Sequence, residues 1–221
     1  MDNKTILSHV DHTLLKPTAS WEEIIQLCEA GVRHRTASVC IPPAYVARVK
    51  EMFDHQLTIC TVIGFPLGYQ TTEIKVTEAA AAVAAGAAEI DMVVNLGDVK
   101  NGMFEAVTRE ISEIKRAIGH TILKVIVETC YLTEREKIAL CRCVTDGGGD
   151  FIKTSTGFGT AGAVLEDILL FKEHLGKGIR IKAAGGIKSK DDLEKFIMAG
   201  CDRIGTSSAV ALLSGEAANG Y

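Results

Sequence analysis

Two stretches of the chain follow one pattern: Asp150-Phe151-Ile152-Lys153-Thr154-Ser155-Thr156-Gly157 and, about thirty residues later, Ile179-Arg180-Ile181-Lys182-Ala183-Ala184-Gly185-Gly186. In each, a short apolar run ends in a lysine and continues into small residues. Amphipathic sequence near 165–175 separates them, so the pair predicts two parallel strands joined by a helix. Because neighbouring parallel strands lie about 4.8 Å apart, we expect Lys153 and Lys182 to lie close together.

The same alternation extends through the whole chain. Strands are predicted at 8–14, 36–41, 57–65, 89–95, 122–129, 151–155, 179–184 and 203–206, with helices near 20–30, 43–53, 72–85, 102–118, 133–145, 165–175 and 189–199 and a short one after 207. Capping-box residues at Ser20, Thr133 and Ser189 mark helix starts. Eight strand-helix units in residues 1–221 predict the α/β class and a single-domain (β/α)8 TIM barrel.

A doubly wound open sheet is the alternative architecture. Such a sheet usually carries a G-x-G-x-x-G fingerprint after its first strand. Here the first predicted strand continues into Leu14-Leu15-Lys16-Pro17 instead, which favours the barrel.

Composition limits the partners. A net charge of -4 argues against nucleic-acid and anionic-membrane binding, so small molecules are the expected ligands. No apolar signal core opens the chain and no run approaches the roughly 18 apolar residues of a membrane span, which predicts a cytoplasmic protein. The seven cysteines include no C-x-x-C pair and are expected to be reduced core thiols, and the histidine spacing predicts no metal site. A homodimer is one assembly that the sequence allows.

The two lysines predict carbonyl chemistry. A nearby like charge, together with desolvation, lowers the pKa of a lysine and leaves a neutral amine that attacks a carbonyl to form a Schiff base. The alternative for either lysine alone is an ammonium that reaches from the strand end into water. Their shared pattern and small flanking residues favour the reactive interpretation.

Two aspartates stand inside apolar runs, Asp11 in the first predicted strand and Asp91 in the fourth. A charge so placed costs several kcal/mol unless it is paired, so both are expected to face a shared polar centre. For Asp91 the alternative is a structural salt bridge to Lys124, for which we expect an internal ion pair on the face shared with Glu128. Glu89 is expected to open its strand at the base of the barrel.

A phosphate site is predicted from three loops rich in glycine and hydroxyl residues. Barrels commonly bind phosphate after strands seven and eight, through backbone N–H groups, hydroxyls and a helix N-terminus. No lysine or arginine is obvious among these loops, so binding is expected to rest mostly on the backbone. The candidate residues are Thr154, Ser155, Thr156, Gly157, Gly185, Gly186, Gly205, Ser207 and Ser208.

Taken together, these segments resemble the deoxyribose-phosphate aldolases over nearly the whole chain. The segments that carry the resemblance are residues 11–17, 37–40, 61–68, 89–93, 124–129, 151–157, 181–186 and 203–208. The resemblance implies a class I aldolase that needs no cofactor and reversibly cleaves 2-deoxy-D-ribose 5-phosphate to D-glyceraldehyde 3-phosphate and acetaldehyde. It also implies that Lys153 forms the Schiff base, Lys182 tunes it, Asp91 donates and accepts protons, and Asp11 supports the substrate or its water.

The chain departs from that family locally. His34-Arg35-Thr36 replaces a glycine and an aromatic residue, Pro42 replaces a common asparagine, and Phe158 stands where some members carry a lysine for the phosphate. Two other functions remain open from the residues alone. A cofactor-free sugar-phosphate isomerase would use the same barrel without needing two lysines, and a non-catalytic phosphosugar-binding protein would need only the loops.

The C-terminal tail, from about residue 214, is small and polar and is expected to be flexible. From the base of the barrel, eight extended residues at about 3.3 Å each would just span the roughly 20 Å to the active-site mouth. We therefore expect Tyr221 to visit the site and assist proton exchange at the enamine carbon. The alternative is a disordered tail with no role.

Overall fold

The structure is a computed structural model that describes residues 1–214, and residues 215–221 lie outside the description. Eight parallel strands form a closed barrel in the order β1 to β8. They are β1 Val10–Thr13, β2 Ser38–Ile41, β3 Ile59–Ile63, β4 Glu89–Val93, β5 Ile122–Ile126, β6 Phe151–Lys153, β7 Arg180–Ala184 and β8 Arg203–Thr206. The single-domain (β/α)8 prediction is confirmed.

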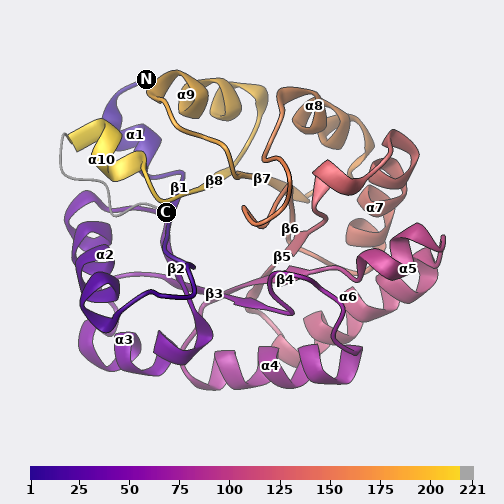
Figure 1. The fold of residues 1–221 in the computed structure, drawn as a ribbon, viewed down its shortest axis with the longest axis horizontal. Helices are drawn as coiled ribbons and strands as arrows, with labels where there is room; N and C mark the ends of the chain where they lie inside the picture. The colour runs from indigo at the N-terminus through magenta and orange to yellow at the C-terminus, as the bar shows by residue number, and fades with distance from the viewer. Residues whose placement is uncertain (215–221) are drawn as a thin grey trace.

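Helices surround the strands as an outer ring (Figure 1). They are α1 Asn3–Leu7, α2 Trp21–His34, α3 Val46–Phe53, α4 Thr72–Ala84, α5 Leu96–Lys100, α6 Phe104–Ile118, α7 Glu134–Asp146, α8 Leu165–His174, α9 Lys190–Ala199 and α10 Ala209–Ser214, with single 3-10 turns at Pro43–Tyr45 and Thr129–Tyr131. The predicted capping boxes at Ser20, Thr133 and Ser189 are confirmed. These caps fix the first residues of α2, α7 and α9. The loops that precede these helices connect them to the strand ends.

The structure differs from the sequence prediction in two respects. Helices α1 and α5 were not predicted, because five residues are too few to show a helical period. Several strands are shorter than expected, and β5 ends at Ile126 rather than at Thr129. The apolar run continues past Ile126, but the backbone at Glu128 turns left-handed, with φ 55°.

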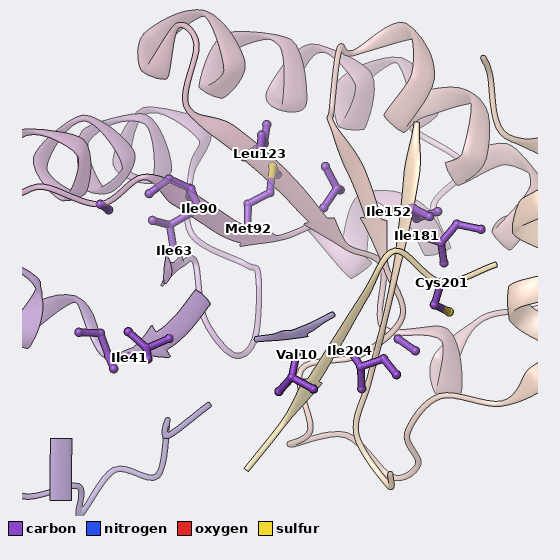
Figure 2. Packing of buried hydrophobic residues seen from close by; sticks show 14 of the residues in the cluster. Val10, Ile41, Ile63, Ile90, Met92, Leu123, Ile152, Ile181, Cys201 and Ile204 are labelled. Atoms are coloured by element: carbon purple, nitrogen blue, oxygen red, sulfur yellow. The ribbon is translucent and has the colours of Figure 1, made fainter. Parts of the chain in front are cut away.

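The apolar core lies between the strands and the ring of helices. Side chains on the outward faces of the strands pack there against the helices, as Figure 2 shows. Labelled members are Val10, Ile41, Ile63, Ile90, Met92, Leu123, Ile152, Ile181, Cys201 and Ile204. Side chains alternate along a strand, so the residues between these ones face the barrel lumen.

The lumen is largely ionic, whereas most barrels fill it with branched apolar residues. Seven charged side chains from the described chain meet there and form ion pairs that cross the barrel: Asp11, Glu89, Asp91, Lys124, Lys153, Lys182 and Arg203. Buried charges of this kind require close pairing, because each one has lost its hydration. The pairing therefore determines where each side chain can lie.

His12 of β1 predicts a pH dependence of stability. Burial lowers the pKa of His12 to about 4 from the ordinary value of 6.5. Between these values the unfolded chain binds a proton that the folded chain does not, so stability is complete above pH 6.5 and falls as the pH drops. Chemical denaturation at pH 7.5 and pH 5 is expected to show wild type losing about 2 kcal/mol more than His12→Gln. The exposed His55→Gln variant is the control, and parallel profiles for all three proteins would contradict the prediction.

Candidate active site

The two lysines that the sequence placed together do meet. Lys153 and Lys182 are paired residues in the register between β6 and β7. Their Nζ atoms both contact Oδ2 of Asp91, at 2.8 Å for Lys153 and 2.7 Å for Lys182. The expectation that the lysines lie close together is therefore confirmed.

Asp91 is the central carboxylate of the lumen. Its Oδ1 accepts a 2.8 Å hydrogen bond from Lys124, so the salt bridge weighed as an alternative exists beside the contacts to Lys153 and Lys182. Burial opposes its charge, but Lys124, Lys153 and Lys182 hold the pKa of Asp91 well below the ordinary value. The group is therefore a carboxylate at neutral pH and accepts hydrogen bonds from all three lysines.

Lys182 is held as an ammonium. Burial opposes the charge, yet Asp11 and Asp91 together raise the pKa of Lys182 above the ordinary value. Asp11 contacts Lys182 Nζ at 2.5 Å and also pairs with Arg203. Burial disfavours the Asp11 carboxylate as well, but Lys182, Lys124 and Arg203 lower its pKa. Asp11 thus acts on the site through Lys182.

A lower layer of charges closes the base of the lumen. Glu89 contacts Lys124 Nζ at 2.7 Å and Arg203 Nη2 at 2.8 Å. The expected internal ion pair of Lys124 is confirmed, but Lys124 does not share it with Glu128, whose carboxylate instead accepts hydrogen bonds from Thr156. Arg203, the first residue of β8, belongs to this layer as well, although its sequence context predicts only a place in a strand.

A cavity of about 560 Å³ opens at the carboxyl ends of the strands, above these charges. Lys153 is one of its lining residues, whereas Lys182 lies below it and is fully buried. The lining includes seven of the predicted phosphate-site residues: Thr156, Gly157, Gly185, Gly186, Gly205, Ser207 and Ser208. Gly185 and Gly186 both have positive φ, 81° and 74°, a backbone form that other residues rarely adopt. This turn therefore lines the cavity with backbone and no side chain.

Two of the predicted binding residues lie beneath the cavity surface. Thr154 Oγ1 accepts a 3.0 Å hydrogen bond from the Ala184 N–H, and Ser155 donates to Thr154. Both side chains are fully buried, and they hold the end of β6 against β7. A substrate role for Thr154 and Ser155 stays a prediction.

A lysine that was not predicted as a site residue also lines the cavity. Lys188 lines it two residues after the Gly185-Gly186 turn, although no lysine was expected among the phosphate loops. The signal was visible as a lysine shortly after the seventh strand. It was overlooked because the chain direction after two consecutive glycines cannot be read from sequence.

Phe158 follows the cavity-lining residues Thr156 and Gly157 and packs against a second aromatic ring. The rings of Phe65 and Phe158 meet edge to face, with centroids 5.4 Å apart and planes at 90°.

Of the other departures from the family pattern, Arg35 ends α2 in a left-handed conformation, and Pro42 precedes the 3-10 turn before α3. Tyr221 lies outside the described residues, and its role stays a prediction.

One group of side chains has the composition of a metal site. Cys40, Cys60 and Asp91 place three potential ligand atoms within 4.8 Å of one another. The oxygens of Asp91 already accept hydrogen bonds from Lys124, Lys153 and Lys182, and Lys124 Nζ also lies 3.2 Å from Cys60 Sγ. Those positive charges oppose a cation at this position.

Within residues 1–214, no helix combines the length and the apolar character that crossing a membrane requires.

Comparison with known proteins gives a consistent result. The family described as DeoC/LacD family aldolase matches residues 5–215. A deoxyribose-phosphate aldolase of Clostridium botulinum (strain Alaska E43 / Type E3) is 57% identical over 221 residues, which is 100% of both chains. That of Clostridioides difficile (strain 630) is 58% identical over 218 residues, 99% of this chain and 100% of the relative.

Solved structures agree in fold and length. The aldolase QR15 superposes with a TM-score of 0.91 at 38% identity, covering 95% of each chain. A deoxyribose phosphate aldolase from Aeropyrum pernix, described as having a unique tetrameric structure, gives 0.89 at 33% identity, covering 97% of this chain and 92% of its own.

Proposed function

Because this chain belongs to the DeoC/LacD family of aldolases, we propose that it is a class I aldolase that reversibly cleaves 2-deoxy-D-ribose 5-phosphate to D-glyceraldehyde 3-phosphate and acetaldehyde. One observation carries the proposal for the site. Lys153 lines the cavity, and its Nζ lies 2.8 Å from the Asp91 carboxylate beside a second lysine. A nucleophile, a proton acceptor and a fixed positive charge therefore meet at one point.

The reaction begins with an amine. Neutral Lys153 attacks the aldehyde carbon of the open-chain sugar, and loss of water from the carbinolamine gives an iminium. The lumen tolerates an uncharged Lys153, because three carboxylates (Asp11, Glu89 and Asp91) then face three cations (Lys124, Lys182 and Arg203). Lys182 stays charged between Asp11 and Asp91, and its proposed role is to tune the neighbouring amine of Lys153.

Carbon-carbon cleavage follows from the iminium. A base removes the proton of the C3 hydroxyl, the C2–C3 bond breaks, and its electron pair forms the enamine of acetaldehyde on Lys153. Asp91, acting through a water, takes up this proton and returns it to the enamine carbon. Hydrolysis of the resulting iminium releases acetaldehyde and restores the amine. The proposal keeps Tyr221 as a further aid to this proton exchange.

The phosphate is proposed to bind at the part of the cavity wall formed by Gly185, Gly186, Lys188, Ser207 and Ser208. The proposed donors are the backbone N–H groups of the two glycines, the two serine hydroxyls and the Lys188 ammonium. In this proposal Lys188 supplies a positive charge for the phosphate, in place of the lysine that some family members carry at the position of Phe158.

Chemical trapping tests the proposed function. The protein is incubated with deoxyribose 5-phosphate, reduced with borohydride and digested, and the adduct is located by mass spectrometry. The expected result is a reduced adduct on Lys153. An adduct on another lysine would overturn the site assignment, and cleavage without any adduct would overturn the Schiff-base mechanism.

Ser207→Asp tests the phosphate side. A carboxylate there repels the phosphate dianion, so KM for deoxyribose 5-phosphate is expected to rise about tenfold or more. KM for unphosphorylated deoxyribose should change far less, because that substrate carries no dianion. Steady-state kinetics with both sugars measure the difference, and equal changes would place the phosphate elsewhere.

Assembly and location are also part of the proposal. The seven cysteines are free thiols, which supports a reducing, cytoplasmic setting. A homodimer is proposed as the assembly, and sedimentation of the purified protein would test it.

A further inference from the structure

Glu128 has a strained backbone conformation and a buried side chain, and it takes no part in the proposed reaction steps. It follows β5 with φ 55° and ψ 65°, the left-handed region, and is only 3% exposed. That conformation costs a residue with a side chain about 1–3 kcal/mol, and it persists only where the surroundings require it. The contacts of the carboxylate show what it holds.

The Glu128 carboxylate binds one residue of the loop after β6. It accepts the Thr156 N–H, at 3.1 Å to Oε1 and 3.3 Å to Oε2, and also the Thr156 hydroxyl. Thr156 Oγ1 in turn accepts the Phe158 N–H at 3.0 Å. Two backbone atoms of the loop segment are thus tied, directly or through one hydroxyl, to a single buried carboxylate.

That loop forms part of the cavity wall, and its next residue packs against an aromatic ring. Thr156 and Gly157 line the cavity, and Phe158 packs edge-on against Phe65. The loop also passes close to Glu128 at Gly159, where an added Cβ would lie 3.1 Å from Oε1. Burial raises the pKa of Glu128, although the hydrogen bonds from Thr156 act in the opposite direction.

Building on the proposed function, we infer that Glu128 is a positioning residue that holds residues 155–158 in the form that binds substrate. With the carboxylate in place, the cavity wall at Thr156 and Gly157 and the Phe158–Phe65 contact exist before the sugar phosphate arrives. Without it, substrate must order the loop on binding, and that ordering weakens affinity. The chemistry at Lys153 is anchored separately, because β6 pairs with both neighbouring strands.

Glu128→Gln keeps the shape and removes the charge that strengthens these bonds. Loss of one charge-assisted hydrogen bond is expected to raise KM for deoxyribose 5-phosphate about tenfold, with kcat within about twofold of wild type. Hydrogen exchange of the peptide that contains residues 154–159 should become faster, since the acceptor of the Thr156 N–H loses its charge. This second readout does not depend on activity.

Glu136→Gln is the matched control. Glu136 also accepts a threonine N–H and hydroxyl, from Thr133 at 2.7 and 2.9 Å, but at the start of α7. It is expected to lower the melting temperature and leave KM unchanged. A Glu128→Gln variant that behaves the same way, with only its melting temperature lowered, overturns the inference, and so does a fall in kcat at constant KM.

Thr156→Val removes the same contact from the other side and keeps the test decisive if Glu128→Gln does not fold. It should raise KM, Thr156→Ser should restore it, and the Glu128→Gln/Thr156→Val double variant should show less than the combined effect. Independent, additive effects overturn the inference. Wild type without cleavage activity would overturn the proposed function and this inference together, whereas active wild type with unchanged KM in Glu128→Gln overturns this inference alone.

Discussion

Lys153→Arg is expected to abolish turnover while the protein stays folded. A guanidinium with a pKa above about 12 keeps its proton and cannot act as a neutral nucleophile. An arginine at this position can still contact Asp91 as Lys153 does, so the pairing of the lumen survives in outline. Loss of a covalent nucleophile commonly costs a factor of about 10⁴ or more in rate. Release of acetaldehyde from deoxyribose 5-phosphate, followed with a coupled dehydrogenase, measures the effect.

A second lysine-to-arginine variant, at Lys188, is the control for the effect of the substitution itself. Lys188→Arg keeps a cation in the cavity wall and is expected to retain activity, because Lys188 is proposed only to hold phosphate. If Lys153→Arg kept even a tenth of the wild-type rate, the Schiff-base assignment to Lys153 would be wrong.

Asp91→Asn is expected to lower both turnover and stability. The amide cannot accept a proton, so kcat should fall by a factor on the order of 10² or more. It also removes the negative charge shared by Lys124, Lys153 and Lys182, and breaking buried pairs in this way costs about 3–5 kcal/mol. From sequence alone these two roles were alternatives, but the geometry joins them in one side chain.

Asp91→Glu distinguishes the roles. It keeps the charge, so it should be more stable than Asp91→Asn, yet it moves the carboxylate by one methylene. A displacement of about 1 Å is enough to cost on the order of 10² in rate. Denaturation curves and deuterium exchange into acetaldehyde measure the two effects. A stable, fully active Asp91→Glu variant would show that Asp91 is a charge partner and does not transfer protons.

Much of the barrel was predictable because its signals are local. Apolar runs of a few residues, capping boxes and small residues after lysines all lie within short windows of sequence, and the closed barrel puts the strand ends together. Lys153, Lys182, Asp91 and Asp11 were therefore found from their positions in strands, and the structure brings all four into one network.

The features that sequence reasoning missed depend on backbone direction or on distant contacts. Glu128 was assigned to a strand face by alternation, but the strand ends two residues before it and the backbone reverses its handedness. Lys188 follows two left-handed glycines, whose turn no residue pattern specifies. Arg203 opens an ordinary apolar strand, and its role appears only when β8 closes beside β1.

The ionic lumen divides unequally along the chain. All three of its carboxylates, Asp11, Glu89 and Asp91, come from strands β1 to β4, and all four of its cations come from β5 to β8. Each half-barrel alone would enclose charges of one sign, so neither can close as an independent unit, but each is the electrostatic complement of the other. During synthesis, we expect the three carboxylates of the first half to stay hydrated until the cations of the second half are available to pair with them. If the chain were divided in the loop before α6, we would expect the two fragments to attract each other through these opposite charges.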